Sequence, residues 1–251
     1  LAKEYKLSDD EKTYTFTLRD DARWHDGKKI SSDDVIFTIN AIKDKNYNSS
    51  LYTSWKDITI QKIDNQTVQF KLKKSFGPFL SFLTLGIMPK HIWEKVPVAN
   101  INLAEANNKP IGTGPYRFKS FTKDKVGAIK SYQLELNKRF YGKKPNIEKI
   151  TLKFYPDYIS AVAALDNRQI DGLAFISAQM RAELKLKGRL ESHDTGLPQY
   201  NSLFLNGNRN SILKSKAIRQ ALTIAIDRKK IIKDALSGGG IIIDGPVLSE
   251  Y

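Results

Sequence analysis

Short strand-like runs alternate with one-sided helical patterns along this chain, and no other sequence feature restricts its fold class as strongly. Residues 14–18 (YTFTL) alternate apolar and polar side chains, which is typical of a strand with one buried face. Ser31 and Asp34 then form the S-x-x-D pattern of a helix start, and apolar residues follow at helical spacing over residues 32–44. The pattern predicts an α/β or mixed α+β protein.

The same reasoning predicts the remaining elements. A hairpin is expected around Asp64-Asn65, where two alternating runs flank a turn signal. A strand over 148–155, a helix capped by Asp157 and a strand over 170–176 should form a right-handed parallel strand–helix–strand unit. Further strands are expected near 116–121, 131–136 and 203–205, short helices near 89–93 and 178–187, and one long helix over 216–236.

Residues 111–116 read IGTGPY and raise the question of a phosphate-binding loop. The known phosphate-binding motifs need a third glycine or a terminal Gly-Lys-Ser/Thr, followed by a helix, and here a strand pattern follows instead. We therefore interpret the run as a tight turn that leads into a strand. In this interpretation Gly112 and Gly114 supply backbone freedom, and Pro115 fixes its own φ angle.

The chain is strongly basic, with 41 Lys and Arg against 27 Asp and Glu, a formal net charge of +14. Such an excess can indicate nucleic acid, an anionic membrane surface or acidic substrates as partners. The basic residues are not gathered into one tract of sequence, and Lys outnumbers Arg, the usual base-reading residue. We interpret the charge mainly as solvated surface and expect no nucleic-acid partner, while a basic nucleic-acid-binding protein stays as an alternative.

No catalytic, cofactor or metal site is predicted. The chain has no cysteine, which excludes disulfides, zinc–cysteine sites and thiol catalysis. His25, His91 and His193 are far apart and have no partner at helical spacing, so each is interpreted as a surface or structural histidine. The G-x-S-x-G motif is absent, and no carboxylate pair stands out for a glycosidase. An enzyme is therefore the least favoured hypothesis.

Four stretches of the chain, taken in order, resemble one protein family. They are residues 15–35, residues 111–116, residues 137–145 with the later Ile170-Asp171, and residues 217–228. The ordered set is similar to the extracytoplasmic solute-binding proteins of family 5, the peptide and nickel class of ABC-importer receptors. Arg168 departs from the pattern, because a glycine or another small residue is usual near that position.

The resemblance implies a periplasmic-binding-protein-like fold of class II, with two lobes joined by hinge strands and the ligand enclosed between them. It assigns residues 1–110 to an inserted subdomain of lobe one, 111–196 to the main sheet of lobe one, and 197–251 to the hinge crossing and the start of lobe two. The chain is expected to be a fragment that lacks the beginning of lobe one and most of lobe two. The turn at 111–116 would return the chain to the main sheet.

The resemblance also implies a function. A family 5 receptor captures oligopeptides outside the cytoplasmic membrane and hands them to ABC permease subunits, while relatives bind nickel chelates, haem or oligosaccharides. Tyr200, Asn201 and Ser202 lie in the inferred hinge strand and would contact the ligand. The protein is expected in the periplasm or on the outer face of the membrane, and any lipid anchor would lie outside this chain.

Overall fold

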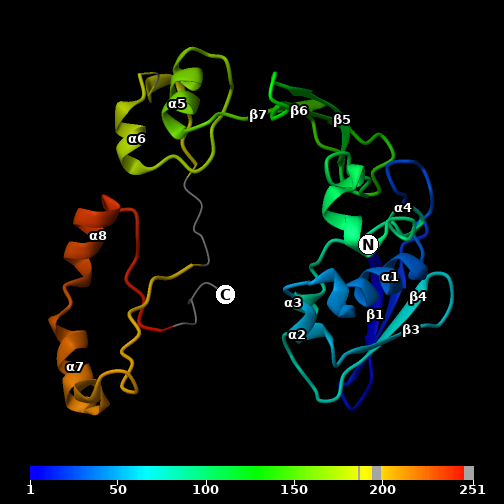
Figure 1. Ribbon diagram of the computed structural model, residues 1–251, viewed down its shortest axis with the longest axis horizontal. Coiled ribbons are helices and arrows are strands. Elements are labelled where there is room, and N and C mark those ends of the chain that lie inside the picture. The colour runs from blue at the N-terminus through cyan, green and yellow to red at the C-terminus, as the bar shows by residue number, and fades with distance from the viewer. Residues whose placement is uncertain (186, 194–198, 246–251) are drawn as a thin grey trace. The chain divides into compact units, whose positions relative to one another are not determined.

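The computed structural model describes residues 1–185, 187–193 and 199–245 (Figure 1). These residues divide into two compact units, the first from Leu1 to Phe154 and the second from Tyr155 onward. Helices and strands occur together, so the predicted mixed class is confirmed. The expected division at residues 110 and 196 refers to the lobes of a complete two-lobed protein, and it stays a prediction.

The first sheet of unit 1 is antiparallel and has the strand order β1-β2-β4-β3. Its strands are β1 (Ala2–Leu7), β2 (Thr13–Leu18), β3 (Thr59–Lys62) and β4 (Thr67–Lys71). Along β2 every second residue is buried, as the alternation predicts, and the hairpin predicted around Asp64-Asn65 joins β3 to β4. Tyr14 pairs with Phe70 and Phe16 with Val68, so one face of the sheet is apolar.

Helix α1 (Ser32–Lys43) packs against this face and completes the main core. Val35 and Ile39 point inward from the helix, and the aromatic rings of Trp55, Phe70 and Phe79 fill the space beside them. Phe79 is fully buried, which matches the high cost of exposing an aromatic ring. Around this core lie the short helices α2 (Tyr52–Trp55), α3 (Phe79–Phe82) and α4 (Lys90–Trp93) and the 3-10 helices Lys45–Tyr47, Val98–Leu103 and Glu105–Asn107.

The second sheet of unit 1 is an antiparallel meander of β5 (Tyr116–Lys123), β6 (Ile129–Leu136) and β7 (Lys149–Lys153). Its two faces differ in chemistry, because paired residues share a face. The rows Phe118–Leu134–Ile150 and Phe121–Tyr132–Leu152 are apolar, whereas the rows Ser120–Gln133–Thr151 and Thr122–Ser131–Lys153 are polar.

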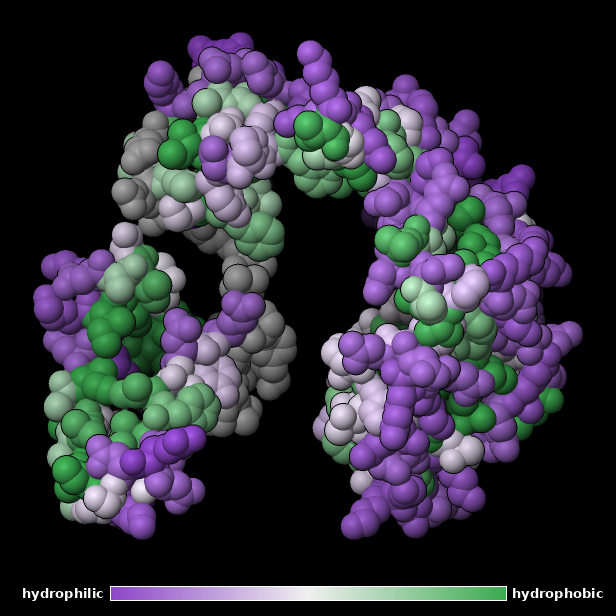
Figure 2. Space-filling view, viewed as in Figure 1, coloured by the Kyte–Doolittle hydropathy of each residue, from purple (hydrophilic) through white to green (hydrophobic). Residues whose placement is uncertain are grey.

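Unit 2 is helical in the residues that the structure describes. Helix α5 (Tyr158–Asp166) begins where the Asp157 carboxylate accepts the Ser160 N–H at 2.7 Å, as predicted. It is followed by α6 (Ala178–Glu183), α7 (Lys216–Ala225), α8 (Arg228–Leu236) and the 3-10 helices Lys187–Arg189 and Ser211–Lys214. Helices α7 and α8 leave apolar side chains exposed, among them Ile224 and Ile231. Figure 2 shows green, hydrophobic surface over these two helices.

Three predicted elements are wrong. Residues 170–176 and 203–205 form no strand among the described residues, so the parallel strand–helix–strand unit is not formed, and β7 pairs antiparallel with β6 instead. Phe175 has φ +59°, in the left-handed region, and such a residue interrupts an extended run. The long helix over 216–236 is two helices, because the Asp227 carboxylate accepts the Lys230 N–H at 2.9 Å and begins α8 anew.

The end of α5 explains why Arg168 departs from the family pattern. Arg168 has φ +57°, its N–H donates to the Leu165 carbonyl at 2.9 Å, and the Gln169 N–H donates to the Ala164 carbonyl at 2.8 Å. These two bonds form a Schellman motif, whose left-handed residue is usually glycine because it has no Cβ atom.

We predict that Arg168→Gly raises the free energy of unfolding by about 0.5–1 kcal/mol, because glycine adopts the left-handed conformation without steric cost. Urea denaturation followed by far-UV circular dichroism would measure the change, since unit 2 contains no tryptophan. Arg168→Ala is the matched control, because it removes the same side chain but keeps Cβ. An equal gain in both variants would show that side-chain loss, and not backbone strain, is responsible.

Candidate functional site

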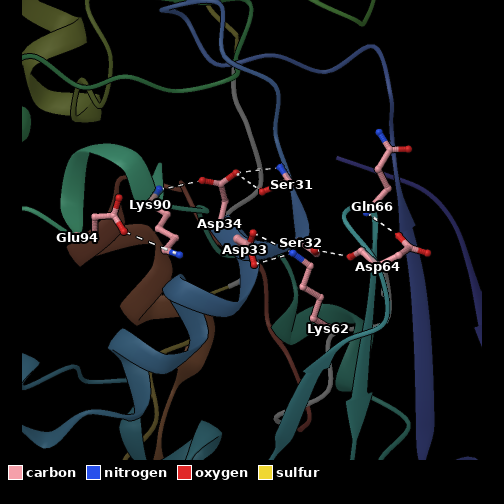
Figure 3. Close-up of polar contacts among 9 residues, drawn as sticks. All are labelled: Ser31, Ser32, Asp33, Asp34, Lys62, Asp64, Gln66, Lys90 and Glu94. Carbon is pink, nitrogen blue, oxygen red and sulfur yellow. Dashed lines mark hydrogen bonds and ion pairs between the residues drawn. The ribbon is translucent and has the colours of Figure 1, made fainter.

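A buried carboxylate organises the polar residues at the start of α1 (Figure 3). Asp34 is only 4% exposed. Its Oδ1 accepts the Lys90 N–H at 2.9 Å, and its Oδ2 accepts the Ser31 N–H at 2.9 Å and the Trp24 Nε1–H at 3.4 Å. The predicted capping box is thereby confirmed. Because both oxygens are engaged in hydrogen bonds to the protein itself, Asp34 is structural rather than a candidate general base.

The charged groups around Asp34 are also paired with one another (Figure 3). Lys62 Nζ lies 3.0 Å from both carboxylate oxygens of Asp33, and Lys90 Nζ lies 3.9 Å from Glu94 Oε2. Hydrogen bonds from Gln66 and Thr67 lower the pKa of the Asp64 carboxyl. Exposed pairs of this kind contribute little to stability. The cluster offers no pair of free carboxylates for acid–base chemistry.

The turn at residues 112–115, here called the GTGP turn, is held by His25. Gly112 N–H donates to His25 Nδ1 at 3.1 Å, and His25 Nε2 lies 3.1 Å from the Gly114 carbonyl oxygen. The backbone N–H of His25 donates in turn to the Gly112 carbonyl at 2.9 Å. A ring that accepts at Nδ1 and donates at Nε2 is the neutral Nε2–H tautomer. His25 is thus structural, and its partners lie 87 residues away in the sequence.

A second side chain, that of Asn137, also holds the GTGP turn in place. The turn has no phosphate-binding geometry. The buried Asn137 donates its side-chain N–H to the Gly114 carbonyl at 3.0 Å and its backbone N–H to the Pro115 carbonyl at 2.8 Å. Neither glycine has a positive φ angle, so the turn does not use the left-handed backbone that glycine allows. Gly112 instead faces the His25 ring, where an added Cβ would lie 3.4 Å from Cε1. The interpretation as a structural turn is confirmed.

The pKa of His25 lies below its ordinary value, first because the ring is partly buried and also because Arg117 carries a positive charge nearby. The adjacent Asp26 accepts a contact of 2.7 Å from His91 Nε2. Burial would raise the pKa of Asp26, but hydrogen bonds from His91 and from the Lys28 N–H outweigh it, and the pKa lies below its ordinary value. The neutral ring and the ionised carboxylate are therefore the forms that this part of the fold favours.

Two open depressions lie on unit 1. One, of about 430 Å³, is lined next to the GTGP turn by His25, Asp26, Lys109, Arg117, Lys119 and Glu135, together with Pro110, Ile111 and Phe118. The other, of about 440 Å³, is lined on the apolar face of the second sheet by Tyr132, Leu152, Phe154, Ile129, Asn107 and Asn108. Neither combines a nucleophile with a base, and charged side chains line only the first.

Metal ligands do not gather in the part of the chain that the structure describes. Across residues 1–185, 187–193 and 199–245, no three His, Asp or Glu side chains are placed to hold an ion. In the same residues no helix has the length and apolar character needed to cross a bilayer.

The predicted ligand residues Tyr200, Asn201 and Ser202 are adjacent in unit 2, in a segment without helix or strand. All three are exposed, and 47% of Tyr200 is accessible to solvent. Their role in ligand binding stays a prediction. Sequence reasoning missed the part played by His25 and Asn137, because nothing near either residue in the sequence signals a partner in the GTGP turn.

Comparison with known proteins extends over the whole chain. Residues 1–251 match the model of the bacterial extracellular solute-binding proteins, family 5 Middle. The oligopeptide-binding protein AppA of Bacillus subtilis is 30% identical over 96% of this chain and 44% of its own length. The dipeptide-binding protein of Escherichia coli is 27% identical over 96% of this chain and 48% of its own length. The chain thus spans about half the length of these relatives.

Solved structures agree with the sequence matches. NikZ from Campylobacter jejuni, in complex with Ni(L-His), has a TM-score of 0.80 and 33% identity, covering 100% of this chain and 50% of its own. AppA from Bacillus subtilis, in complex with a nonapeptide, has a TM-score of 0.71 and 29% identity, covering 95% of this chain and 47% of its own.

The His25 geometry predicts a pH-dependent stability of unit 1. The pKa of His25 is lowered in the folded state, so the stabilisation is complete above 6.5, the ordinary value, and decreases as pH falls below it. Urea denaturation followed by tryptophan fluorescence, from about pH 7.5 to about pH 5.5, would measure this loss, because His25 takes up a proton in this range when the chain is unfolded. All three tryptophans, Trp24, Trp55 and Trp93, lie in unit 1.

Two matched variants test whether His25 causes the pH dependence of stability. Gln at position 25 offers an acceptor and a donor but does not titrate, so His25→Gln should flatten the pH dependence. His193→Gln removes an exposed histidine of unit 2 and should leave the dependence as it is. A wild-type slope that survives in His25→Gln would contradict the assignment.

Proposed function

Because the chain belongs to the bacterial extracellular solute-binding proteins of family 5, we propose that it is part of an ABC-importer receptor that captures oligopeptides and delivers them to membrane permease subunits. The structural neighbours confirm the predicted periplasmic-binding-protein-like fold. The observation that carries the peptide assignment is the match along nearly the whole chain to the oligopeptide-binding AppA of Bacillus subtilis, a protein also solved with a nonapeptide.

The proposed mechanism is capture without covalent chemistry. In a two-lobed receptor, ligand contacts to both lobes favour the closed state, and the hinge residues absorb the motion. In our proposal residues 1–110 and 111–196 build lobe one, and residues 197–251 cross the hinge into lobe two. Exposed hydroxyl and amide groups at Tyr200, Asn201 and Ser202 would hydrogen-bond the peptide backbone there, as a few convergent polar groups commonly do in ligand sites.

In the proposed receptor, the GTGP turn and the Asp34 cluster hold unit 1 together. Gly114 is bound from two sides by His25 and Asn137, which keeps the start of β5 in place. The family is one of solute-binding proteins, which agrees with the structural role of Asp34 and with the prediction that the chain is not an enzyme. An extracytoplasmic location follows from the family, and attachment by a lipid anchor is a separate proposal for the complete protein.

A chelated metal is the second candidate cargo. It is supported by the similarity to NikZ, a protein solved with Ni(L-His), at a TM-score of 0.80. In that case the metal and its amino acid would be the transported ligand, and no resident ion is required. Peptide is preferred because the relatives matched by sequence include an oligopeptide-binding and a dipeptide-binding protein.

Native mass spectrometry of the complete protein that contains this chain, purified without denaturation, would separate the two. A series of released peptide masses would support the peptide proposal and would give the preferred length. A released nickel–histidine complex, with no binding from a mixture of peptides, would replace it with the chelate. Binding of neither would contradict both assignments and leave only the family.

We predict that Tyr200→Phe and Asn201→Ala each weaken peptide binding in the complete protein by about tenfold, because each removes a hydrogen bond to the ligand. Isothermal titration calorimetry with a captured peptide would measure the change. Asn208→Ala is the matched control, since it removes an exposed amide close by in the chain. Equal affinities for all three variants would exclude Tyr200 and Asn201 from the site.

A further inference from the structure

The positive charge of the chain is concentrated on the second sheet of unit 1. Residues 116–153 contain eleven Lys and Arg but three Asp and Glu, and so carry eight of the fourteen net positive charges. Seven of these basic residues lie on β5, β6, β7 or the turn between β5 and β6, and the other four lie in the loop between β6 and β7. In Figure 2 purple, hydrophilic side chains project from this sheet, whose ribbons are labelled β5 to β7 in Figure 1.

Basic residues outnumber acidic residues at both ends of this sheet. Glu135 Oε1 lies 2.7 Å from Arg117 Nη2, and Glu135 Oε2 lies 4.0 Å from Lys119 Nζ. Glu148 precedes β7, whose first residue pairs with Glu135, so both acids lie at the same end of the sheet. The opposite end, where β5 turns into β6, keeps its lysines and a single acid, Asp124.

This turn, with the strand ends beside it, is here called the basic hairpin and comprises residues 123–130. Asp124 Oδ1 accepts the N–H of Val126 at 3.0 Å and of Ala128 at 2.9 Å, so the acid is used to build the turn. Its other oxygen lies 3.9 Å from Lys130 Nζ. Val126 lies at the tip of the turn and is 88% exposed. An apolar side chain is thus presented to solvent among lysines.

Three lysines flank this tip. Lys125 and Lys123 lie on either side of Asp124 in the chain, Lys130 follows the turn, and all three are exposed. Lys123 Nζ lies over the Phe121 ring, 5.4 Å from its centroid, which supports an extended side chain along the sheet. An exposed apolar residue ringed by flexible cations is the arrangement that suits a membrane interface, where lysines meet headgroups and the apolar residue meets the acyl boundary.

We propose that the basic hairpin is a docking surface for anionic phospholipid headgroups. Each lysine near an acidic bilayer adds to the attraction, and the attraction is screened within a Debye length. Lipid is favoured over nucleic acid because the tip is apolar and carries no exposed aromatic ring on which a base could stack. The proposal goes beyond cargo capture, since it orients unit 1 at the membrane whichever ligand the complete protein binds.

Vesicle co-sedimentation of the 251-residue chain tests the proposal. Binding is expected to vesicles of phosphatidylcholine and phosphatidylglycerol, but not to phosphatidylcholine alone, and it should weaken as salt rises from about 50 to about 300 mM. Replacing Lys123, Lys125 and Lys130 by Gln should reduce the affinity by about fivefold for each lysine. The matched control replaces Lys71, at the end of β4, and Lys73 and Lys74, which follow it, by Gln; all three are exposed.

An equal loss of vesicle affinity in the control variant would show that the net charge of the chain, and not the basic hairpin, determines binding. That result would overturn the proposal. Absence of binding by the unaltered chain would overturn it too. A DNA duplex that displaces the vesicles at equal phosphate concentration would show that the surface reads polyanions in general, which contradicts the membrane assignment.

A second measurement reports contact at the tip itself. The chain has no cysteine, so Val126→Cys can carry a single environment-sensitive fluorophore. Its emission should shift to the blue on acidic vesicles, because the tip enters the interface. Ile63→Cys, an exposed site beside the turn between β3 and β4, is the control and should not shift. A shift at residue 63 without one at residue 126 would place the contact elsewhere and overturn the proposal.

Discussion

The first unit depends on one buried carboxylate. Asp34 collects hydrogen bonds from the Ser31 and Lys90 backbone and from the Trp24 ring, and so joins the segment before α1, the helix itself and the start of α4. A buried charge is tolerated only when its oxygens are satisfied, and these are. The arrangement also places the carboxylate at the positive end of the α1 dipole. From this fixed start, α1 carries Val35 and Ile39 into the core above the first sheet.

The GTGP turn is bound to the same region by His25, whose neighbour Asp26 contacts His91 of α4. A glycine-rich run in a basic chain suggests anion binding, yet its N–H and carbonyl groups are committed to His25 and Asn137. Backbone groups that could bind an anion stabilise the fold instead, because side chains already form hydrogen bonds with them. Ligand capture in our proposal accordingly rests on the hinge segment, not on this turn.

The second sheet shows how pairing creates a surface that sequence spacing conceals. Its rows separate apolar from polar residues, and three exposed lysines lie at or beside the turn between β5 and β6. A receptor working beside a membrane needs both a cargo site and an orientation. The proposed cargo residues lie in unit 2, and the proposed lipid contact lies in unit 1, so the two roles rest on separate residues.

The sequence by itself determined several local elements and the resemblance to the family. The alternation in β2, the capping box of α1, the Asp157 cap of α5 and the ordered motifs all depend on residues within a few positions of one another. Tertiary structure alone decided the contacts of His25 with a turn 87 residues away and the gathering of lysines on one hairpin. It also decided that residues 170–176 form no strand, since a strand exists only where another edge pairs with it. Periodicity records which side of an element is apolar, but it does not record which distant backbone will meet that element.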